Sequence, residues 1–261
     1  MGRLTVFLTG ATGVIGSRVV GHDVVINLAT HIPPSRRAFF PGAWRQNSRV
    51  RSVVSANLAM SALACGAARF IQESFAPIYE DAGDAWIDER GPIRVARYNR
   101  SVLHAERAAE QVTPEGVAGV VLRFAYFYGA DSDFTRDAIR YARRGWAPAL
   151  GFPKSFISSV SHDDAAAAVA AALDVPAGIY NVCDDRPVRR REFTDALAAA
   201  MHVPPPRFFP TWVARLAGSL GETLARSQRI ANRKLRGASP WAPRYPSVVE
   251  GWQAVLAELP R

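Results

Sequence analysis

The segment YNRSVLHAE, residues 98–106, places a tyrosine where acid–base chemistry could occur, but the flanking Arg97 and Arg100 point away from it on a helix. Tyr98 precedes Val102 by four residues, so on a helix both side chains face the same side. A tyrosine has an unperturbed pKa of about 10, and it needs a nearby cation to transfer protons at neutral pH. Val102 would instead desolvate the phenolate and raise its pKa, and Lys154 is the first lysine of the chain. The segment therefore predicts a tyrosine whose usual proton relay is disabled.

The start of the chain, RLTVFLTGATGVIGSRVV, reads as an apolar strand over residues 4–8, a glycine turn and the beginning of an amphipathic helix. Gly10 permits the tight turn, Gly13 lets the backbone approach a pyrophosphate at the helix N-terminus, and Gly16 allows close packing of helix on strand. A purely structural turn is the alternative. We predict a dinucleotide site with the contacts Thr9, Gly10, Thr12, Gly13, Ile15 and Gly16.

This TGxxGxxG spacing resembles the extended short-chain dehydrogenase/reductase superfamily, in particular its NAD-dependent epimerase/dehydratase family. Further segments resemble the family in the same order: DVVINLATHIPP its fourth strand, RFIQESFAPIYE its fifth, YNRSVLHAE its catalytic helix and LRFAYFYG its sixth strand and turn. The series covers nearly the whole chain. The resemblance implies NAD or NADP as cofactor, with further cofactor contacts at Ala29, Thr30 and Phe124.

The catalytic triad of that family is incomplete in this chain. In the family a serine or threonine holds the substrate oxygen, a tyrosine transfers the proton, and a lysine four residues later lowers the tyrosine pKa. Here Tyr98 matches the tyrosine, Val102 replaces the lysine, and an ungapped match places Phe75 at the serine position. Ser74 is one residue early and would reach the site only if the strand ended or bulged there. We predict Tyr98 and Ser74 as catalytic residues, with substrate contacts at His31, Phe75, Val102 and Tyr126.

A second departure from the family lies between Val20 and Gly21. A dinucleotide-binding half needs a second and a third strand before its fourth, and one strand–helix–strand unit takes roughly 30 residues. Here the fourth strand comes at once, which would move the first helix to the opposite face of the sheet. Either the protein lacks these elements or a segment is omitted from this sequence, and the intact mass distinguishes the two. The residue that reads the adenosine ribose is unassigned, so NAD and NADP are not distinguished.

The composition indicates a folded globular protein, since 49% of its 261 residues are hydrophobic. No long apolar run or signal peptide is present, so we expect a cytoplasmic protein without membrane contact. Two distant cysteines, Cys65 and Cys183, predict neither a metal site nor a disulfide framework. The net charge of +9 is spread over helices without a nucleic-acid motif, so we expect a small-molecule substrate and no nucleic acid. A homodimer is compatible with the family.

Together these features predict an α/β fold with a doubly wound, Rossmann-like parallel sheet, with or without its second and third strands, and a smaller helical lobe. We assign residues 1–128 and 156–183 to the dinucleotide-binding domain, and 129–155 and 184–261 to the substrate lobe. Three functions fit: an atypical NAD(P)-dependent oxidoreductase or epimerase acting on a small apolar molecule; a non-redox isomerase, cyclase or dehydratase; or a noncatalytic dinucleotide-sensing or scaffold protein.

Overall fold

The computed structural model describes residues 4–9, 22–34, 37–40, 42–147, 151–210, 212 and 218–259. Its centre is a five-stranded sheet in the order β1-β2-β3-β5-β9, and every neighbouring pair is parallel. These strands are β1 (Val6–Thr9), β2 (Val24–Asn27), β3 (Arg69–Phe75), β5 (Ala118–Phe124) and β9 (Gly178–Val182). The predicted α/β fold with a parallel sheet is confirmed.

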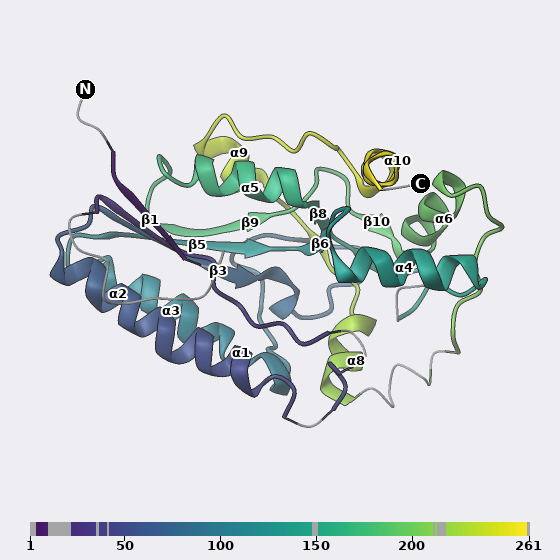
Figure 1. Cartoon of the computed structure of the whole chain (residues 1–261), viewed down its shortest axis with the longest axis horizontal. Helices are drawn as coiled ribbons and strands as arrows, with labels where there is room; N and C mark the ends of the chain where they lie inside the picture. Colours follow the sequence, from purple (N-terminus) through teal and green to yellow (C-terminus); the bar gives the residue numbers. More distant parts are fainter. Residues whose placement is uncertain are drawn as a thin grey trace.

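Helices cover both faces of this sheet, as Figure 1 shows. On one face α2 (Ser55–Ala64) and α3 (Val102–Val112) bury their alanine-rich sides against Val25, Phe70 and Val121. On the other face α5 (His162–Ala171) and α9 (Arg233–Ala238) pack against the alternate residues of the same strands. Successive side chains of a strand point to opposite faces, so near-continuous apolar strands fill both layers.

The strand β1 is the outermost strand of the described part of the sheet. It pairs with β2 in parallel, from Val6 opposite Val24 to Thr9 opposite Asn27. No strand among the described residues pairs with its other side, and the side chains of Leu4, Val6 and Leu8 are exposed. The residues after Thr9 that connect β1 to β2 lie outside the described ranges, as do Gly10, Thr12, Gly13, Ile15 and Gly16.

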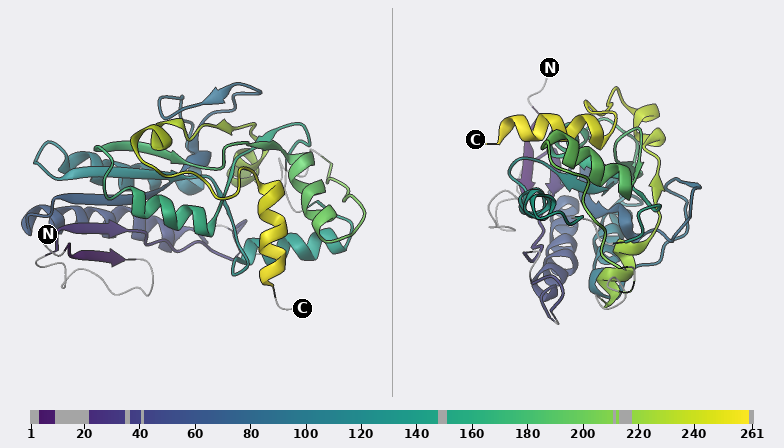
Figure 2. Two further views of the ribbon diagram at one scale, coloured as in Figure 1. Left: turned by 90° about the horizontal axis from the view of Figure 1, so that it is seen from above. Right: turned by 90° about the vertical axis from the view of Figure 1, so that its right-hand side faces the viewer.

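A separate hydrophobic cluster lies beyond one end of the sheet. Residues of α4 (Asp133–Arg143), α6 (Arg190–Ala200) and α10 (Val248–Glu258) form it around the buried ring of Trp252. Figure 2 shows these three helices together at one end of the molecule. The division into two domains stays a prediction.

Short elements join this cluster to the sheet. Two-stranded pairings form between β6 (Tyr126–Tyr128) and β8 (Ser159–Ser161), β7 (Phe156–Ile157) and β10 (Val188–Arg189), and β4 (Trp86–Ile87) and β11 (Arg229–Ile230). The remaining helical segments are α1 (Arg45–Arg49), η1 (Val50–Val54), η2 (Ala76–Ile78), η3 (Arg97–Asn99) and α8 (Gly218–Ala225). None of the helices in the described part of the chain is long and apolar enough to cross a membrane.

Candidate active site

A chain of buried polar side chains crosses the carboxyl ends of the first three strands. The Thr9 hydroxyl donates to Asn27 Oδ1 at 2.9 Å, and Asn27 Nδ2 donates to Gln72 Oε1 at 2.8 Å. These residues are direct neighbours in the strand register. The Ala29 amide donates to the same Asn27 Oδ1, so the loop after β2 is fixed to this chain. In open parallel sheets ligands bind outside the carboxyl ends of the strands, where this network lies.

The structure places the predicted cofactor contacts in different surroundings. Thr9 and Ala29 are buried at the carboxyl edge, and Thr30 is exposed just beyond it. Phe124 is 2% exposed and packs into the core on the α5 face, 5.2 Å from the ring of Phe127. His31 is exposed, and its amide donates to Asn47 Oδ1. Cofactor binding by these residues stays a prediction.

The helix that was expected to carry Tyr98 begins later than predicted. Tyr98 lies in the 3₁₀ turn η3, after the extended residue Ala96, and α3 begins only at Val102. The prediction that one helix carries Tyr98 and Val102 was therefore wrong. Val102 is fully buried, whereas Tyr98 is partly exposed and contacts the ring of Trp44 at 4.6 Å.

Burial raises the pKa of the Tyr98 hydroxyl well above its usual value, and the neighbouring Tyr126 raises it further. Thr223, Arg51 and Arg226 offset this effect only in part. At neutral pH Tyr98 therefore keeps its proton and can donate a hydrogen bond. This agrees with the uncharged Val102 at the position four residues after Tyr98.

The hydroxyl of Ser74 is directed to a buried ion pair. Ser74 lies within β3, is fully buried, and donates to Glu106 Oε1 at 2.5 Å. Glu106 also accepts two hydrogen bonds from the guanidinium of Arg123, at 2.8 and 2.7 Å. The strand neither ends nor bulges before Ser74, so its side chain faces α3. Its catalytic role is a prediction that none of these contacts supports.

Phe75, the last residue of β3, faces the opposite way from Ser74. Its ring packs edge-on against the ring of Tyr126, with the centroids 5.7 Å apart. Trp44, Phe75, Tyr98 and Tyr126 are all partly exposed, and we call them the aromatic cluster. It lies at the carboxyl ends of β3 and β5, and partly exposed rings there present flat apolar surface to a ligand.

Arginines surround this aromatic cluster, and their inward direction was not predicted from the sequence. Arg51 is buried and donates to Glu73 Oε1 and to Asn99 Oδ1, each at 2.6 Å. Arg226 is buried and donates to the carbonyl oxygens of Tyr79 and Arg94. Arg190 is also buried. Arg190 and Arg226 belong to the basic runs RPVRRREF and RSQRIANRKLR, and sequence periodicity does not show which arginine of such a run turns inward.

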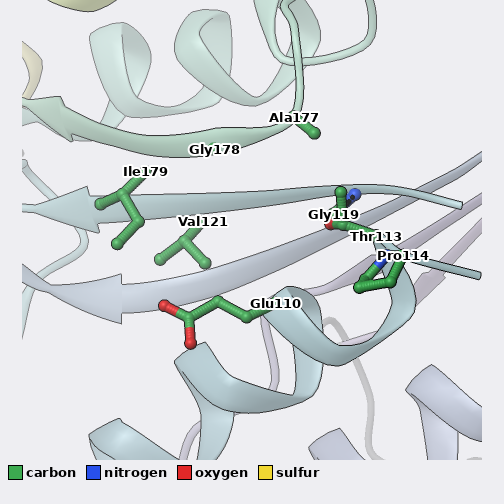
Figure 3. A pocket seen from close by; sticks show the side chains of 8 residues that line it. All are labelled: Glu110, Thr113, Pro114, Gly119, Val121, Ala177, Gly178 and Ile179. Atoms are coloured by element: carbon green, nitrogen blue, oxygen red, sulfur yellow. Dashed lines mark hydrogen bonds between the residues drawn. The ribbon is translucent and has the colours of Figure 1, made fainter.

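Two other features lie away from this site. Figure 3 shows a surface pocket at the amino ends of β5 and β9, lined by Glu110, Thr113, Pro114, Gly119, Val121, Ala177, Gly178 and Ile179. It is at the opposite edge of the sheet from the aromatic cluster. Across the described ranges, no group of His, Cys, Asp and Glu side chains is arranged to hold a metal ion.

Sequence similarity to a reductase from a Streptomyces species shows the family of this chain. The protein, 3-diazoavenalumate denitrifying reductase, is 33% identical over 224 residues, which are 81% of this chain and 72% of the relative. The chain belongs to the NAD-dependent epimerase/dehydratase family of the short-chain dehydrogenase/reductase superfamily. No protein-family model matches the sequence of this chain.

Solved structures agree with the fold of this epimerase/dehydratase family member. The human epimerase family protein SDR39U1 (isoform 2), solved with NADPH, has a TM-score of 0.82 and 17% identity, and the match covers 96% of this chain and 85% of that chain. RMD from Pseudomonas aeruginosa, complexed with NADPH, has a TM-score of 0.69 and 21% identity, over 90% and 80% of the two chains. DesIV (dTDP-glucose 4,6-dehydratase) from Streptomyces venezuelae, solved with NAD and TYD, has a TM-score of 0.72 and 17% identity, over 93% and 74%.

Proposed function

We propose that this protein is an NAD(P)H-dependent reductase that replaces the diazo group of a small aromatic compound by hydrogen and releases dinitrogen. One observation carries the proposal: the site keeps aromatic surface at the carboxyl edge of the sheet but has no proton relay. Val102 is fully buried and uncharged where the family has lysine, and Tyr98 holds its proton. The relative whose name specifies a diazo compound and a denitrifying reduction supports this reaction class.

The residues described at the carboxyl edge fit a dinucleotide. Ala29 is small, Thr30 beside it is exposed, and Asn47 Nδ2 is buried with no hydrogen-bond partner among the described residues. Asn47 already holds the loop after β2 through the His31 amide. These groups would hold the nicotinamide half of NADH or NADPH, and the glycine turn would hold the pyrophosphate. The solved neighbours that contain NADPH or NAD support the same assignment.

The reaction class explains why the proton relay is dispensable. A bound reduced nicotinamide supplies hydride, which carries both electrons that the reduction needs. In an arenediazonium ion a carbon–hydrogen bond forms, the carbon–nitrogen bond breaks, and dinitrogen leaves with the electron pair of that bond. No proton is consumed. Reduction of a carbonyl group, in contrast, leaves an alkoxide that a general acid must protonate.

The side chains of the site would then act by position rather than by proton transfer. The rings of Phe75 and Tyr126, which pack edge-on, would hold the aromatic ring of the substrate. Tyr98 would donate a hydrogen bond from its protonated hydroxyl.

An isotope experiment tests this function. The full chain is mixed with an arenediazonium salt and with NADPH or NADH deuterated at nicotinamide C4, and loss of the nicotinamide absorbance, dinitrogen and the arene are measured. We expect enzyme-dependent turnover with one dinitrogen per nicotinamide oxidised, and deuterium on the arene carbon. A parallel reaction in D₂O with unlabelled cofactor should give an arene without deuterium. Turnover no faster than the protein-free control, or an arene hydrogen derived from solvent, would contradict the proposal.

A further inference from the structure

One buried arginine connects two of the segments that carry the aromatic cluster. Arg51 Nη1 donates to Asn99 Oδ1 and Arg51 Nη2 donates to Glu73 Oε1, each at 2.6 Å. Asn99 is the residue after Tyr98 in the 3₁₀ turn η3. Glu73 lies two residues before Phe75 in β3, so the two side chains leave the strand on the same face. The guanidinium therefore joins the turn that carries one ring to the strand that carries another.

The helix that carries Arg51 contacts the same turn at a second place. Trp44 lies at the beginning of α1, about two helical turns before Arg51, and its ring contacts the ring of Tyr98 at 4.6 Å. The indole of Trp44 also donates to the carbonyl oxygen of Ala38 at 2.9 Å, which sets the orientation of this ring. The turn η3 is thus held to the helix by a ring contact and by the hydrogen bond from Arg51.

Arg51 lies in η1, a π-helical turn between α1 and α2. The residues at both junctions have helical backbone angles, so the three elements form one continuous helix with a local change of pitch. Such π-helical turns are rare, and they are frequent at functional sites. The change of pitch at Arg51 is a second observation that points to a role of this residue in the site.

The charge of Arg51 is neutralised by Glu73, and the two side chains are 3% and 9% exposed. A buried ion pair adds little stability compared with apolar side chains of the same volume, because both groups lose their hydration. Its geometry is specific, since a planar guanidinium donates its hydrogen bonds in fixed directions. The pair therefore contributes direction more than stability.

We infer that Arg51 is a positioning residue of the aromatic cluster. By holding Asn99 and Glu73 together, it fixes the ring of Tyr98 relative to the ring of Phe75. This inference rests on the proposed function, in which an aromatic substrate lies against these rings. Loss of the connection would leave the rings in place along the chain but would no longer fix the distance between them.

Three single variants separate this role from a general effect on folding. Arg51→Lys keeps a charge for Glu73 but lacks the planar fork that reaches Asn99 at the same time. Asn99→Leu removes the acceptor on the turn and keeps a similar volume. Arg49→Lys makes the same chemical change at an exposed position of α1 and is the matched control. Arg51→Lys and Asn99→Leu are also combined with Tyr98→Ala, which removes the ring that Arg51 is inferred to position.

The probe is benzonitrile, which has the shape of a benzenediazonium ion but does not react. Calorimetry gives its dissociation constant with and without NADPH, and steady-state kinetics gives KM and kcat for benzenediazonium. We expect Arg51→Lys and Asn99→Leu each to weaken benzonitrile binding by about 5-fold or more, and Arg49→Lys to bind as the wild type does. The dissociation constant of NADPH should stay within about 2-fold of the wild type. In the Tyr98→Ala background neither substitution should have a further effect above about 2-fold.

The outcomes separate the inference from the proposed function. Unchanged benzonitrile binding in Arg51→Lys overturns the inference, and so do effects that are equally large with and without the Tyr98 ring. If the effects depend on Tyr98 but benzenediazonium is not reduced, the proposed function fails and the inference stands. If benzenediazonium is reduced but the effects are independent of Tyr98, the inference fails and the proposed function stands. A wild type that neither binds benzonitrile nor reduces benzenediazonium contradicts both. If Arg51→Lys does not fold, as judged by circular dichroism, Asn99→Leu decides in its place.

Discussion

Ser74 donates a hydrogen bond to Glu106 at 2.5 Å and thereby joins β3 to α3 through a carboxylate that also binds Arg123. Both charged side chains are 5% exposed. Glu106→Gln would leave the Arg123 charge buried without a counter-ion, so we expect a loss of about 3–5 kcal/mol in the free energy of unfolding. Urea denaturation measures it. Glu110→Gln, one helical turn later and exposed, should change stability by less than about 0.5 kcal/mol. Equal effects of the two variants would contradict this assignment.

The contact between α3 and β5 depends on Gly119. A Cβ at this position would lie 1.9 Å from the carbonyl oxygen of Ala109, which is part of the helix backbone and cannot rotate away. We expect Gly119→Ala to lower the free energy of unfolding by about 1–3 kcal/mol or more, because the helix must move from the strand. Gly237→Ala in α9 meets no atom within 4 Å and is the matched control. It should leave stability unchanged or raise it by up to about 1 kcal/mol. Thermal unfolding of both variants checks the prediction.

If the reduction consumes no proton, the hydroxyl of Tyr98 is not essential. We expect Tyr98→Phe to retain turnover of an arenediazonium substrate within about 10-fold of the wild type, since it removes one hydrogen bond of about 0.5–1.5 kcal/mol and no proton transfer. Steady-state kinetics with NADPH measures it. A fall of 100-fold or more would instead indicate that Tyr98 transfers a proton and that an epimerase-like or carbonyl reaction is catalysed.

Restoring the family's lysine should not restore its chemistry. Val102 is fully buried at the first residue of α3, and Tyr98 lies in the preceding 3₁₀ turn, so Val102→Lys places an uncompensated charge in the core. We expect a loss of several kcal/mol in the free energy of unfolding and no lowering of the Tyr98 pKa to neutrality. Tyrosine absorbance is measured against pH in Val102→Lys and in the control variant Val102→Leu. A restored proton relay would give Val102→Lys a tyrosine that titrates well below pH 10.

The carboxyl group of Asp184 should make stability depend on pH. Asp184 is 2% exposed, accepts from the Ser159 hydroxyl at 2.9 Å, and lies near Asp185 and Tyr128. Burial raises its pKa to about 8, above the value of about 3.9 in an unfolded chain. The folded state therefore holds a proton that the unfolded state releases between these values, and stability falls as pH rises through that window.

Removing this carboxyl group should flatten that dependence. From about pH 4 to about pH 8 the free energy of unfolding of the wild type should fall, and the fall in Asp184→Asn should be smaller by a few kcal/mol. Urea denaturation across that range measures the slope, which an effect on packing alone would not change. Asp174→Asn, which is exposed, should show the wild-type slope. A wild-type slope in Asp184→Asn would show that Asp184 is not the group responsible.

The sequence by itself determined the parallel α/β architecture, because apolar strands and alanine-rich helices alternate along the chain with periods that any member of this fold must have. It also determined that Tyr98 has no lysine partner, since that is a matter of residue identity and spacing alone. It did not determine where α3 begins. Four residues fit one helical turn, but the 3₁₀ turn before Val102 separates Tyr98 from the helix.

Only the tertiary structure decided which polar groups form hydrogen bonds or ion pairs within the fold and which do not. Ser74 was predicted as a catalytic residue, yet its hydroxyl is bound to the buried Glu106, which lies 20 or more residues away in sequence. The neighbouring Glu73 is bound in the same way to the distant Arg51. Arg190 stands between Arg189 and Arg191 in one basic run, yet it is the one of the three that is buried, and it forms no ion pair with any residue that the structure describes. Local sequence fixes the direction of a side chain relative to its own strand or helix. The partner that it meets is set by the packing of elements distant in the chain, so pairing and desolvation are properties of the folded protein.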